Sequence, residues 1–297
     1  MIHYNECPVC KNLSINYSFT AKDNTVSYEL FEVWKCAQCS LLFTQDIPAE
    51  DEIGKYYNSL NYISHSDTKE GFVNQAYHTV RSVALTGKKK LIEKSTGIAA
   101  GNILDVGCGT GAFLNTMKKG GWQVTGVEPD EGARQKADSL YSIKPLPSSE
   151  LFNLNKASFN AITLWHVLEH VHRLHDYIHQ IKTLLTARGQ LFIALPNHTS
   201  TDAMNYKENW AAFDVPRHLY HFSPYSMNIL MNLHGLQIKE MKPMWFDSFY
   251  VSMLSEKYKN GENNYFNAGI SAVASNVNAF INKEKSSSVI YIIEKIS

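Results

Sequence analysis

Four histidines lie within the stretch "LWHVLEHVHRLH" at 164–175, namely His166, His170, His172 and His175. His166, Glu169 and His170 are three and four positions apart, a spacing that brings side chains onto one face of a helix. Such a face could hold a divalent metal, and a neutral imidazole could accept a proton near pH 7. The alternative is that His172 and His175 are solvated and only one or two of the others face a site.

A second set of ligand-type residues lies near the start of the chain, where "CPVC" and "WKCAQC" contain Cys7, Cys10, Cys36 and Cys39. Each CxxC pair can form a tight turn that points two thiolates at one ion, and the β-prone "VSYELFEVW" can return the chain as a hairpin. Bound zinc contributes its binding energy directly to folding, which a segment with so little core needs. We predict a structural zinc ribbon. The alternative, two redox-active pairs, lacks the usual strand-to-helix context.

Composition narrows the class of partner. Lysine plus arginine and aspartate plus glutamate are balanced at 28 each, so no overall field attracts nucleic acid or an anionic membrane. Hydrophobic and aromatic contents of 44% and 12% are enough for a sizeable core. The first residues show no signal segment and no later stretch is apolar enough to span a bilayer. We therefore expect a cytoplasmic protein with a small or peptide-like substrate; the sequence does not indicate an oligomeric state.

The order of predicted elements favours an α/β protein with a doubly wound, mostly parallel sheet. Helical segments separate the strand-like runs "NILDVG", "WQVTGV", a weaker "YSIKPL", "FNAITLW", "QLFIALP", "GLQIKEMKPM" and "SSVIYIIEKI". We divide the chain into a zinc ribbon at 1–45, a helical linker or lid at 46–100, and a main domain at 101–297 with a helical insertion at about 247–285. In the linker, Tyr56, Tyr57 and Tyr62 could cover a site and contact substrate, or pack between domains.

The stretch "NILDVGCGTGAF" is a strand that runs into a glycine-rich turn and a helix, as in nucleotide-binding sites. The glycines and Ala112 also satisfy the looser dinucleotide pattern GxGxxA. Asp105 argues against a pyrophosphate, because an anion two residues before Gly107 would repel it but could attract an ammonium group. Glu128, about 20 residues beyond the turn in "VTGVEPD", could accept hydrogen bonds from both hydroxyls of a ribose. The ligand should thus carry a ribose and an amino-acid end, as S-adenosylmethionine does.

These motifs resemble those of the class I S-adenosylmethionine-dependent methyltransferases. "ILDVGCGTG", "VTGVEPD", "FNAITLWHVLEHV" and "RGQLFIALPN" match four of their segments, and the resemblance covers about residues 100 to 245. It implies a seven-stranded sheet whose last strand, here "VIYIIEKI", is antiparallel. The resemblance also implies that the methionine side of the cofactor is lined by Asp105, Gly107, Cys108, Gly109, Gly111 and Phe113. Trp165 and His166 would lie beneath the methionine end. Glu128 would bind the ribose, and Pro129 and Asp130 would flank the ribose and adenine.

The stretch "DVPRHLYHFSPYSMNILMNLHGL" and the cysteine-rich start resemble one branch of this family, often linked with methylation of sugars, polysaccharides or other small metabolites. We therefore expect methyl transfer to a small-molecule or sugar-precursor acceptor, at oxygen or carbon rather than nitrogen. One alternative is an RNA methyltransferase that grips RNA with its ribbon, although the balanced charge and the absence of an "NPPY"-type motif argue against it. Another is a non-catalytic cofactor-binding scaffold.

Two groups of residues could take a proton from the acceptor. His166 directly follows the fourth strand. Related quinone-type O-methyltransferases carry acidic residues in this segment, so Glu169 and His170 could also hold a magnesium-like ion, although an imidazole at 166 suits zinc-like ions better. The second group, after the fifth strand in "NWAAFDVPRHLYHFSP", supplies His218 and His221 as bases, and Trp210 and Arg217 as substrate contacts. The alternative is that Arg217 and His218 tie this loop to the core.

Overall fold

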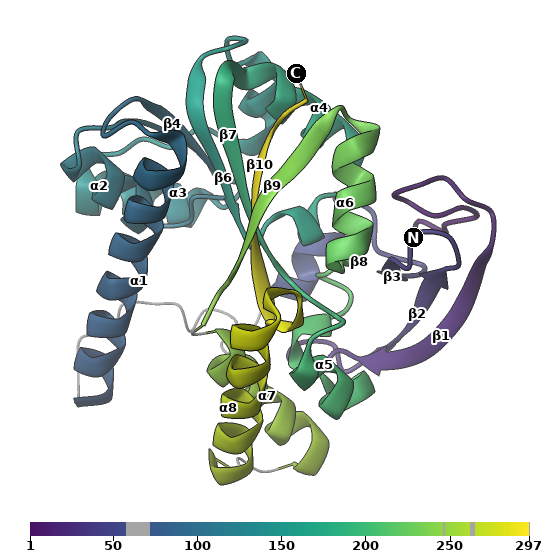
Figure 1. Ribbon diagram of the computed structural model, residues 1–297. Coiled ribbons are helices and arrows are strands. Elements are labelled where there is room, and N and C mark those ends of the chain that lie inside the picture. The colour runs from purple at the N-terminus through teal and green to yellow at the C-terminus, as the bar shows by residue number, and fades with distance from the viewer. Residues whose placement is uncertain (58–71, 246, 262–264, 297) are drawn as a thin grey trace. The chain divides into compact units, whose positions relative to one another are not determined.

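The computed structural model (Figure 1) describes residues 1–57, 72–245, 247–261 and 265–296. The chain divides into two compact units. The first unit comprises Met1–Ser64, His166–His175 and Ala194–Tyr291, and the second comprises His65–Trp165, Asp176–Ile193 and Ile292–Ser297. The predicted domain boundaries at residues 45 and 100 stay predictions. Tyr62, which the sequence suggests for a lid, lies outside the described residues.

The second unit contains the predicted alternation of strands and helices. Its parallel strands are β4 (Asn102–Val106), β5 (Gln123–Val127) and β6 (Phe159–Trp165), and Ile103 pairs with Val124 on one side and Ala161 on the other. The helices of this part of the chain are α1 (Phe72–Thr96), α2 (Ala112–Lys119), α3 (Glu131–Tyr141) and α4 (Leu174–Leu184). Apolar residues of α1, α2 and the strands form one core cluster, namely Ile92, Ile103, Phe113, Met117, Trp122, Ala161, Phe192 and Ile292.

The main sheet has the strand order β5-β4-β6-β7-β10-β9, in which β7 is Leu185–Pro196, β9 is Leu236–Pro243 and β10 is Ser288–Lys295. The backbone N–H of Asn197, just after β7, donates to Ser287, just before β10. At the opposite ends, Lys295 donates to the carbonyl of Leu185. Strands β7 and β10 therefore run in opposite directions, which confirms the antiparallel last strand.

The sequence predicts seven strands in this sheet, and the described structure forms six, so the count is wrong by one. The predicted strand "YSIKPL" contributes only a single parallel bridge, between Leu146 and Val127. Pro145 and Pro147 flank Leu146. Proline fixes φ near −65°, whereas a parallel strand needs about −120°, so the backbone departs from regular strand geometry on both sides of Leu146.

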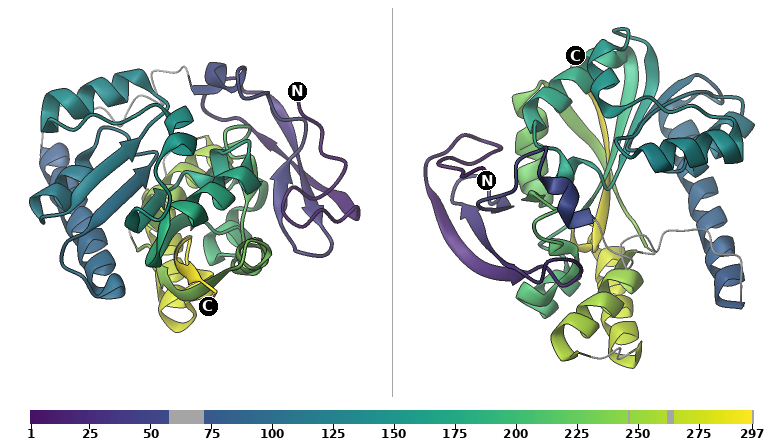
Figure 2. Two further views of the ribbon diagram at one scale, coloured as in Figure 1. Left: turned by 90° about the horizontal axis from the view of Figure 1, so that it is seen from above. Right: turned by 180° about the vertical axis from the view of Figure 1, so that it is seen from behind.

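The first unit begins with an antiparallel hairpin, visible in both views of Figure 2. Strand β1 (Ile15–Lys22) pairs with β2 (Leu30–Cys36), which pairs with β3 (Leu42–Thr44). The β1–β2 turn is held by the carboxylate of Asp23, which accepts backbone N–H bonds from Thr25, Val26 and Ser27. The predicted hairpin between the two CxxC pairs is thus formed.

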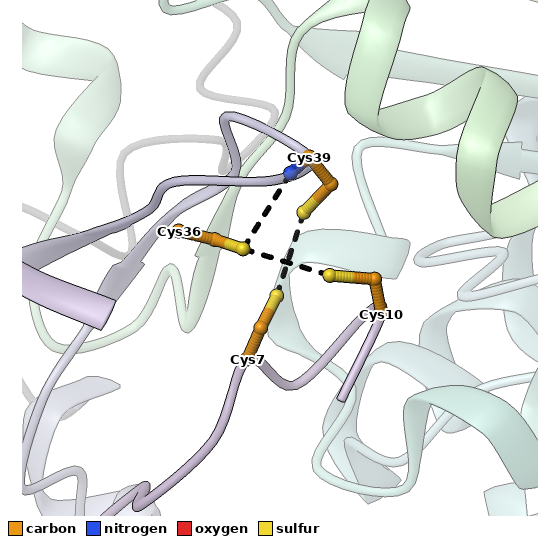
Figure 3. Close-up of side chains that lie close together, drawn as sticks. All are labelled: Cys7, Cys10, Cys36 and Cys39. Atoms are coloured by element: carbon orange, nitrogen blue, oxygen red, sulfur yellow. Dashed lines mark hydrogen bonds between the residues drawn. The ribbon is translucent and has the colours of Figure 1, made fainter. Parts of the chain in front are cut away.

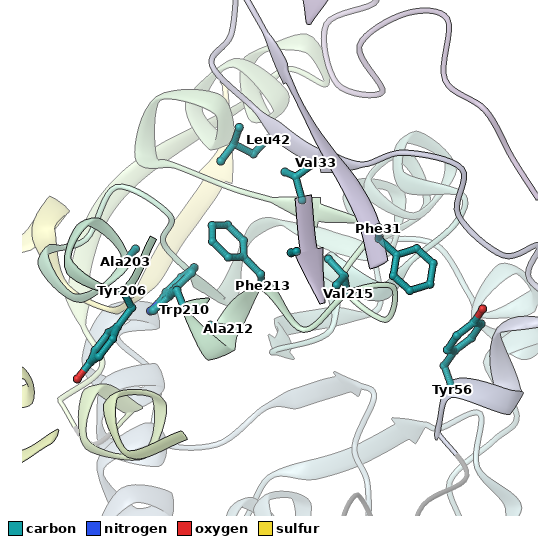
Figure 4. Packing of buried hydrophobic residues seen from close by; sticks show 11 residues of the cluster. Phe31, Val33, Leu42, Tyr56, Ala203, Tyr206, Trp210, Ala212, Phe213 and Val215 are labelled. Atoms are coloured by element: carbon teal, nitrogen blue, oxygen red, sulfur yellow. The ribbon is translucent and has the colours of Figure 1, made fainter. Parts of the chain in front are cut away.

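The hairpin sheet gains a fourth strand from a distant part of the chain. Strand β8 (Tyr220–His221) pairs with β3, so that Phe43 lies opposite Tyr220. Beneath it, apolar side chains of the hairpin pack on residues 203–215 in the cluster of Figure 4, where Phe31, Val33 and Leu42 meet Trp210, Phe213 and Val215. Burial of these aromatic and aliphatic side chains is the main favourable term that joins the hairpin to the rest of the first unit.

The remaining helices lie mostly in the first unit, and their bounds are α5 (Thr201–Tyr206), α6 (Pro224–Leu233), α7 (Asp247–Asn260) and α8 (Tyr265–Ile281). Short 3-10 helices cover Ile53–Tyr57, Ser148–Asn153, Leu168–His170, Lys207–Asn209, Ala211–Phe213 and Lys283–Lys285. Helices α7 and α8 lie side by side, in the segment where the sequence predicts an inserted pair (Figures 1 and 2). Helix α6 begins at the predicted cap, where Ser223 and Ser226 form a capping box. Within the described ranges, no helix is long and apolar enough to cross a bilayer.

Candidate functional site

The four cysteines of the two CxxC pairs converge in the first unit (Figure 3). Sγ of Cys7 lies 3.5 Å from Sγ of Cys39, Sγ of Cys10 lies 3.5 Å from Sγ of Cys36, and all four sulfurs lie within 4.8 Å of one another. None of the chain's cysteines, all of which are described, forms a disulfide. The hydrogen bond from Cys39 lowers the pKa of the Cys7 thiol, which favours its thiolate form.

This cysteine cluster fits a tetrahedral ion. Zinc–sulfur bonds of about 2.3 Å place the sulfurs of a tetrahedral site about 3.8 Å apart, close to the separations seen here. Each CxxC turn is closed by a residue in the left-handed region, Lys11 with φ 61° and Ser40 with φ 58°. The backbone N–H groups of these two residues donate to the carbonyls of Cys7 and Cys36. The donor set and its turns therefore suit zinc.

The glycine loop follows β4 and leads into α2 in the second unit. Gly107, Gly109 and Gly111 have φ of 71°, 53° and 77°, a region that other residues rarely adopt. A Cβ at Gly109 would meet nothing within 4 Å, whereas one at Gly111 would lie 3.0 Å from Cβ of Ala137. Gly111 therefore permits close packing of α3, and Gly109 faces space in which a ligand can approach the backbone.

Asp105, in β4, is buried and lies just before this loop. Its Oδ1 accepts a hydrogen bond of 2.5 Å from Oγ1 of Thr163, in β6. Burial raises the pKa of Asp105 to about 7, while the positive charge of Lys88 opposes the rise. A cation bound beside this carboxylate would favour its ionised form. The site is therefore suited to the ammonium group that the sequence predicts.

Glu128 follows β5, and two backbone donors orient its buried carboxylate. The N–H of Gly109 donates to Oε2 at 2.8 Å, and the N–H of Asp130 donates to Oε1 at 3.0 Å. Burial raises the pKa of Glu128, and these two hydrogen bonds oppose the rise. Each oxygen keeps acceptor capacity for a further donor, so the carboxylate can still bind a pair of hydroxyls.

Lys88, in α1, is a residue of this region that the sequence analysis misses. Its Nζ lies 4.1 Å from the centre of the Trp165 ring, within the range of a cation–π contact. Phe113 packs edge-on against the same indole, with ring centres 5.6 Å apart. Lys88 stands in a run of three lysines, and no local signal distinguishes it from Lys89 and Lys90. Only the packing of α1 identifies it.

Three other predicted cofactor residues have local structural partners. Cys108 is buried beside Leu114 and Ile143, and burial raises the pKa of its thiol, which makes it a poor nucleophile. Asp130 caps α3, where its side chain accepts the N–H of Ala133 at 2.6 Å. The carbonyl of Pro129 accepts a hydrogen bond from the guanidinium of Arg134, in α3. The predicted contacts of Pro129 and Asp130 with ribose and adenine stay predictions.

His166, the first residue after β6, lies in the first unit between two carboxylates. Its Nε2 is 2.8 Å from Oδ2 of Asp247, and its Nδ1 is 3.4 Å from Oε1 of Glu169. Burial alone would lower the pKa of His166, but the charges of Asp247 and Glu169 raise it to about 10. His166 is therefore protonated at neutral pH, and an imidazolium cannot accept a proton. This argues against the predicted role of His166 as a base.

Glu169, His170 and His218, here called the imidazole cluster, come together beside His166. One ligand-type atom of each residue lies within 4.8 Å of those of the other two, and the two imidazole ring centres are 4.6 Å apart. Glu169 is 1% exposed, and its carboxylate lies 3.4 Å from Nδ1 of His166, which forms an ion pair with it. Burial lowers the pKa of His170 to about 4, so this ring is neutral. The cluster includes a residue of the second predicted group, His218, and not its neighbour His221.

Arg217 is fully buried, and its guanidinium binds protein groups. Its Nε donates to Asp214 at 3.0 Å, its Nη1 to the carbonyl of Tyr56 at 2.8 Å, and its Nη2 to Asp23 in the hairpin turn at 2.8 Å. Burial alone would raise the pKa of Asp23, but the hydrogen bond from Arg217 holds it well below its usual range. The prediction that Arg217 contacts substrate is therefore replaced by its alternative, in which Arg217 ties the loop to the core.

Two more predicted site residues are part of the core of the first unit. Trp210 belongs to the cluster of Figure 4, and its Nε1 donates to Asp202 at 2.8 Å. His221 lies in β8 with its Nε2 3.2 Å from Oγ1 of Thr44, and burial lowers its pKa well below its usual value. Both positions favour packing over the predicted substrate and base roles. Tyr57 differs, because its hydroxyl lies 3.1 Å from Nδ1 of His170, beside the imidazole cluster.

His172 and His175, which the sequence suggests are solvated, are half-buried and bonded to the N-terminal segment. Nε2 of His172 lies 3.0 Å from the carbonyl oxygen of Pro48. His175 donates from Nε2 to the carbonyl of Pro8, between the first two cysteines, at 2.9 Å, and its Nδ1 is 2.8 Å from Nε2 of His234. The expectation of a solvated surface is therefore wrong for both.

Comparison with known proteins identifies the family of the chain. A family model described as "Methyltransferase domain" matches residues 78–240, more than half of the chain. The ubiquinone biosynthesis O-methyltransferase of Glaesserella parasuis serovar 5 (strain SH0165) is 30% identical over 125 residues, covering 36% of this chain and 50% of that protein. The chain thus spans about half the length of the curated relatives it matches.

Two solved structures show the same fold. The magnesium protoporphyrin IX methyltransferase of Synechocystis PCC 6803, solved with bound SAH, has a TM-score of 0.51 and 12% identity, and the match covers 81% of this chain and 96% of that one. The 1,6-didemethyltoxoflavin-N1-methyltransferase of Burkholderia thailandensis has a TM-score of 0.51 and 14% identity, covering 93% of this chain and 100% of that one. At these identities the likeness concerns the fold alone.

Proposed function

The chain belongs to the methyltransferase domain family, and from this premise we propose that it is an S-adenosylmethionine-dependent enzyme that methylates a small molecule at oxygen or carbon. A hydroxyl-bearing metabolite such as a sugar or polysaccharide precursor is the class of acceptor we favour. The observation that carries the proposal is the imidazole cluster, in which a buried carboxylate and a neutral imidazole lie together.

The residues of the second unit fit the cofactor. Asp105 would bind the ammonium group and Glu128 the two ribose hydroxyls, while the open face of Gly109 leaves room for the nucleoside. Trp165 and Lys88 would line the methionine end, where the lysine can pair with the carboxylate. When bound, the cofactor supplies an electrophilic methyl group, and the protein contributes mainly by holding the acceptor oxygen or carbon in line with it.

The acceptor's proton needs a different group from His166, which already carries one. We propose that the imidazole cluster receives the acceptor's hydroxyl, since Glu169 and the neutral ring of His170 are hydrogen-bond acceptors. These residues follow β6, and the carboxyl ends of parallel strands are where ligands bind in doubly wound sheets. Tyr57, beside His170, would contact the same acceptor.

Two further observations support a small acceptor. The matched relative is named for O-methylation in ubiquinone biosynthesis, which is small-molecule chemistry. The hairpin of the first unit, the element that the alternative would use to bind RNA, is already paired with β8 and packed on residues 203–215. We also propose that the cysteine cluster binds one structural zinc ion, since its sulfur separations match a tetrahedral site.

The first test is turnover. The purified chain, supplied with S-adenosylmethionine labelled in the methyl group and a metabolite extract, should release S-adenosylhomocysteine and label a compound of low molecular weight. Glu169→Gln should lower kcat by about 10²-fold or more, the contribution of a group that assists proton removal, with cofactor affinity unchanged. Label in RNA, or label in no compound at all, would contradict the proposal.

His166 provides a pH-dependent prediction for stability. Because its pKa is about 10 in the folded chain and about 6.5 when unfolded, its ion pairs stabilise the fold fully below pH 6.5 and lose their effect as the pH rises to 10. The free energy of unfolding of His166→Gln, measured in urea, should therefore fall below that of wild type by most at pH 6 and by least at pH 10. The exposed His179→Gln is the control. A gap independent of pH would show that His166 is not charged.

A further inference from the structure

Exposed apolar side chains gather on one face of α8, in the helical insertion of the first unit. Phe280 is 83% exposed and Ile281 80% exposed, and Val273 and Val277 are each more than half exposed. Spacings of three and four residues place these side chains on one face of the helix, here called the apolar stripe. Single apolar side chains are ordinary on a protein surface, whereas a contiguous set marks an interaction site.

The buried side of the α7–α8 pair is polar instead. In α7, all of which is described, the buried side chains are those of Ser248, Ser252, Ser255 and Glu256. Oγ of Ser248 donates to Oδ1 of Asn276, in α8, at 3.0 Å. In the described part of α8, the buried side chains are those of Ser275 and Ala279. The two helices therefore meet through small, mostly polar side chains and expose apolar ones.

This distribution is the reverse of that expected for two helices in water, where the apolar face is buried. It is typical of helices that contact lipid, because small residues such as serine let the helices approach closely while apolar side chains face outward. Trp245, Phe249 and Tyr250 add exposed aromatic rings just before and within the first turn of α7. Aromatic rings are enriched where a membrane meets water.

Lysines lie at both ends of α8. In the described part of 247–285, the exposed lysines are Lys257, Lys259 and Lys283. Glu284 is the single exposed acid of that part, because Glu256 is buried and Asp247 forms an ion pair. The bond between Ser248 and Asn276 joins the start of α7 to the end of α8, so the lysines that end α7 lie near the start of α8. The insertion thus has a local positive charge, although the whole chain is balanced.

We propose that the apolar stripe and the lysines at its ends bind the surface of an anionic lipid membrane. With 17 residues, α8 is shorter than the about 20 residues that span a bilayer, and its stripe covers one face, so the helix would lie in the plane of the headgroups. Figures 1 and 2 show the α7–α8 pair extending away from the end of β9. This inference does not depend on the acceptor or on methyl transfer.

The size and charge of the surface favour lipid over a second copy of the chain. A stable dimer needs about 20–30 residues on each side of its interface. The stripe offers four apolar side chains, and the lysines of two identical surfaces would repel one another. Membrane binding needs a smaller surface, because a few inserted side chains act together with basic residues that attract anionic headgroups.

Co-sedimentation of the full chain with lipid vesicles tests the proposal. Wild type should sediment with vesicles of phosphatidylcholine and phosphatidylglycerol, and should stay in solution with vesicles of phosphatidylcholine alone. The double variant Phe280→Ser/Ile281→Ser should bind the mixed vesicles about tenfold more weakly or less tightly still. Lys257→Gln and Lys259→Gln should each weaken binding by about fivefold. The control Leu30→Ser, which removes an equally exposed apolar side chain from β2, should bind as wild type does.

Fluorescence then shows whether the stripe enters the bilayer. Phe280→Trp keeps an aromatic ring, and the added indole should be quenched by brominated lipid, whereas that of Leu30→Trp should not. Absence of wild-type binding to the mixed vesicles, or equal binding by Phe280→Ser/Ile281→Ser, would overturn the proposal. So would a wild-type dimer in analytical ultracentrifugation that the double variant dissociates, since a second copy would then cover the stripe. Affinity for S-adenosylhomocysteine should be the same in all these variants, so failure of the membrane surface is distinguishable from failure of the proposed function.

Discussion

Replacement of Glu128 by alanine is expected to weaken the binding of S-adenosylhomocysteine by about 10²- to 10⁴-fold. The side chain is fixed by the N–H groups of Gly109 and Asp130, and each of its oxygens can accept one ribose hydroxyl. A hydrogen bond to a charged group contributes about 1.5–3 kcal/mol, so two of them contribute about 3–6 kcal/mol. Isothermal titration calorimetry of the wild type and the variant measures this difference directly.

Two variants make the result specific to Glu128. Glu131→Ala removes a neighbouring exposed carboxylate in the first turn of α3 and should leave the affinity within about twofold. Glu128→Gln keeps one carbonyl acceptor and should give an intermediate affinity. If Glu128→Ala binds as tightly as wild type while its circular dichroism spectrum is unchanged, the ribose is held elsewhere and the assignment is wrong.

The cofactor region could be predicted because its signal is local. A strand, a turn of three glycines and a helix follow one another within twenty residues, so the spacing of Asp105, Gly109 and Gly111 already fixes their relative positions. Where the sequence prediction fails in this region, the reason is also local: the prolines on both sides of Leu146 leave one bridge where the hydrophobic pattern favours a strand. Lys88 is different, because its role depends on how α1 packs.

The roles of the residues proposed to bind the acceptor could not be predicted, because the side chains that contact these residues are distant in sequence. Arg217 has the composition and position of a substrate clamp, but its partner Asp23 lies 194 residues away, and their buried ion pair makes it structural. His166 looks like a base until Asp247, in a predicted insertion, is found 2.8 Å from its Nε2. A titratable side chain takes its role from its neighbours, and the spacing of residues in one segment does not reveal neighbours from another.

The same limit explains the histidines after β6. "LWHVLEHVHRLH" groups four imidazoles, yet the structure gives them different partners: a pair of carboxylates for His166, a loop carbonyl for His170, and backbone carbonyls of the N-terminal segment for His172 and His175. All four thus bind groups that lie outside the motif, and one of these groups, the carbonyl of Pro8, belongs to the first CxxC turn. Because the carbonyls of Pro8 and Pro48 bind His175 and His172, loss of the zinc is expected to affect the segment after β6 as well.

Replacement of Cys36 by serine is expected to abolish zinc binding at the cysteine cluster and to unfold the hairpin. Structural zinc sites contribute about 10–16 kcal/mol of apparent binding free energy at pH 7, as much as the whole stability of a typical domain. The buried side chains of the three hairpin strands include Ala21, Phe31, Val33 and Leu42, which pack in one cluster with residues 203–215. These contacts and the thiolates carry the stability of the hairpin. Hydrogen exchange followed by mass spectrometry should show loss of protection over residues 1–45.

The loss should spread to the loop that the hairpin holds. Strand β8 pairs with β3, Asp23 binds Arg217, and Oγ1 of Thr44 donates to the carbonyl of His218, so each contact ends on the segment at 217–221. Protection of that segment should fall with the hairpin, and methyl transfer should decline because the carbonyls that orient His170 and His218 are released. Affinity for S-adenosylhomocysteine, which depends on Asp105 and Glu128, should change by no more than a few fold.

Cys108→Ser is the matched control, because it alters a buried cysteine that takes no part in the cysteine cluster. It should keep the zinc of that cluster and the protection of the hairpin. If Cys36→Ser loses its zinc and the hairpin stays protected, the packing on residues 203–215 is sufficient by itself and zinc is not structural. If the hairpin unfolds while protection at 217–221 is retained, the ribbon and the imidazole cluster are independent, and the loop contacts described above do not position the histidines.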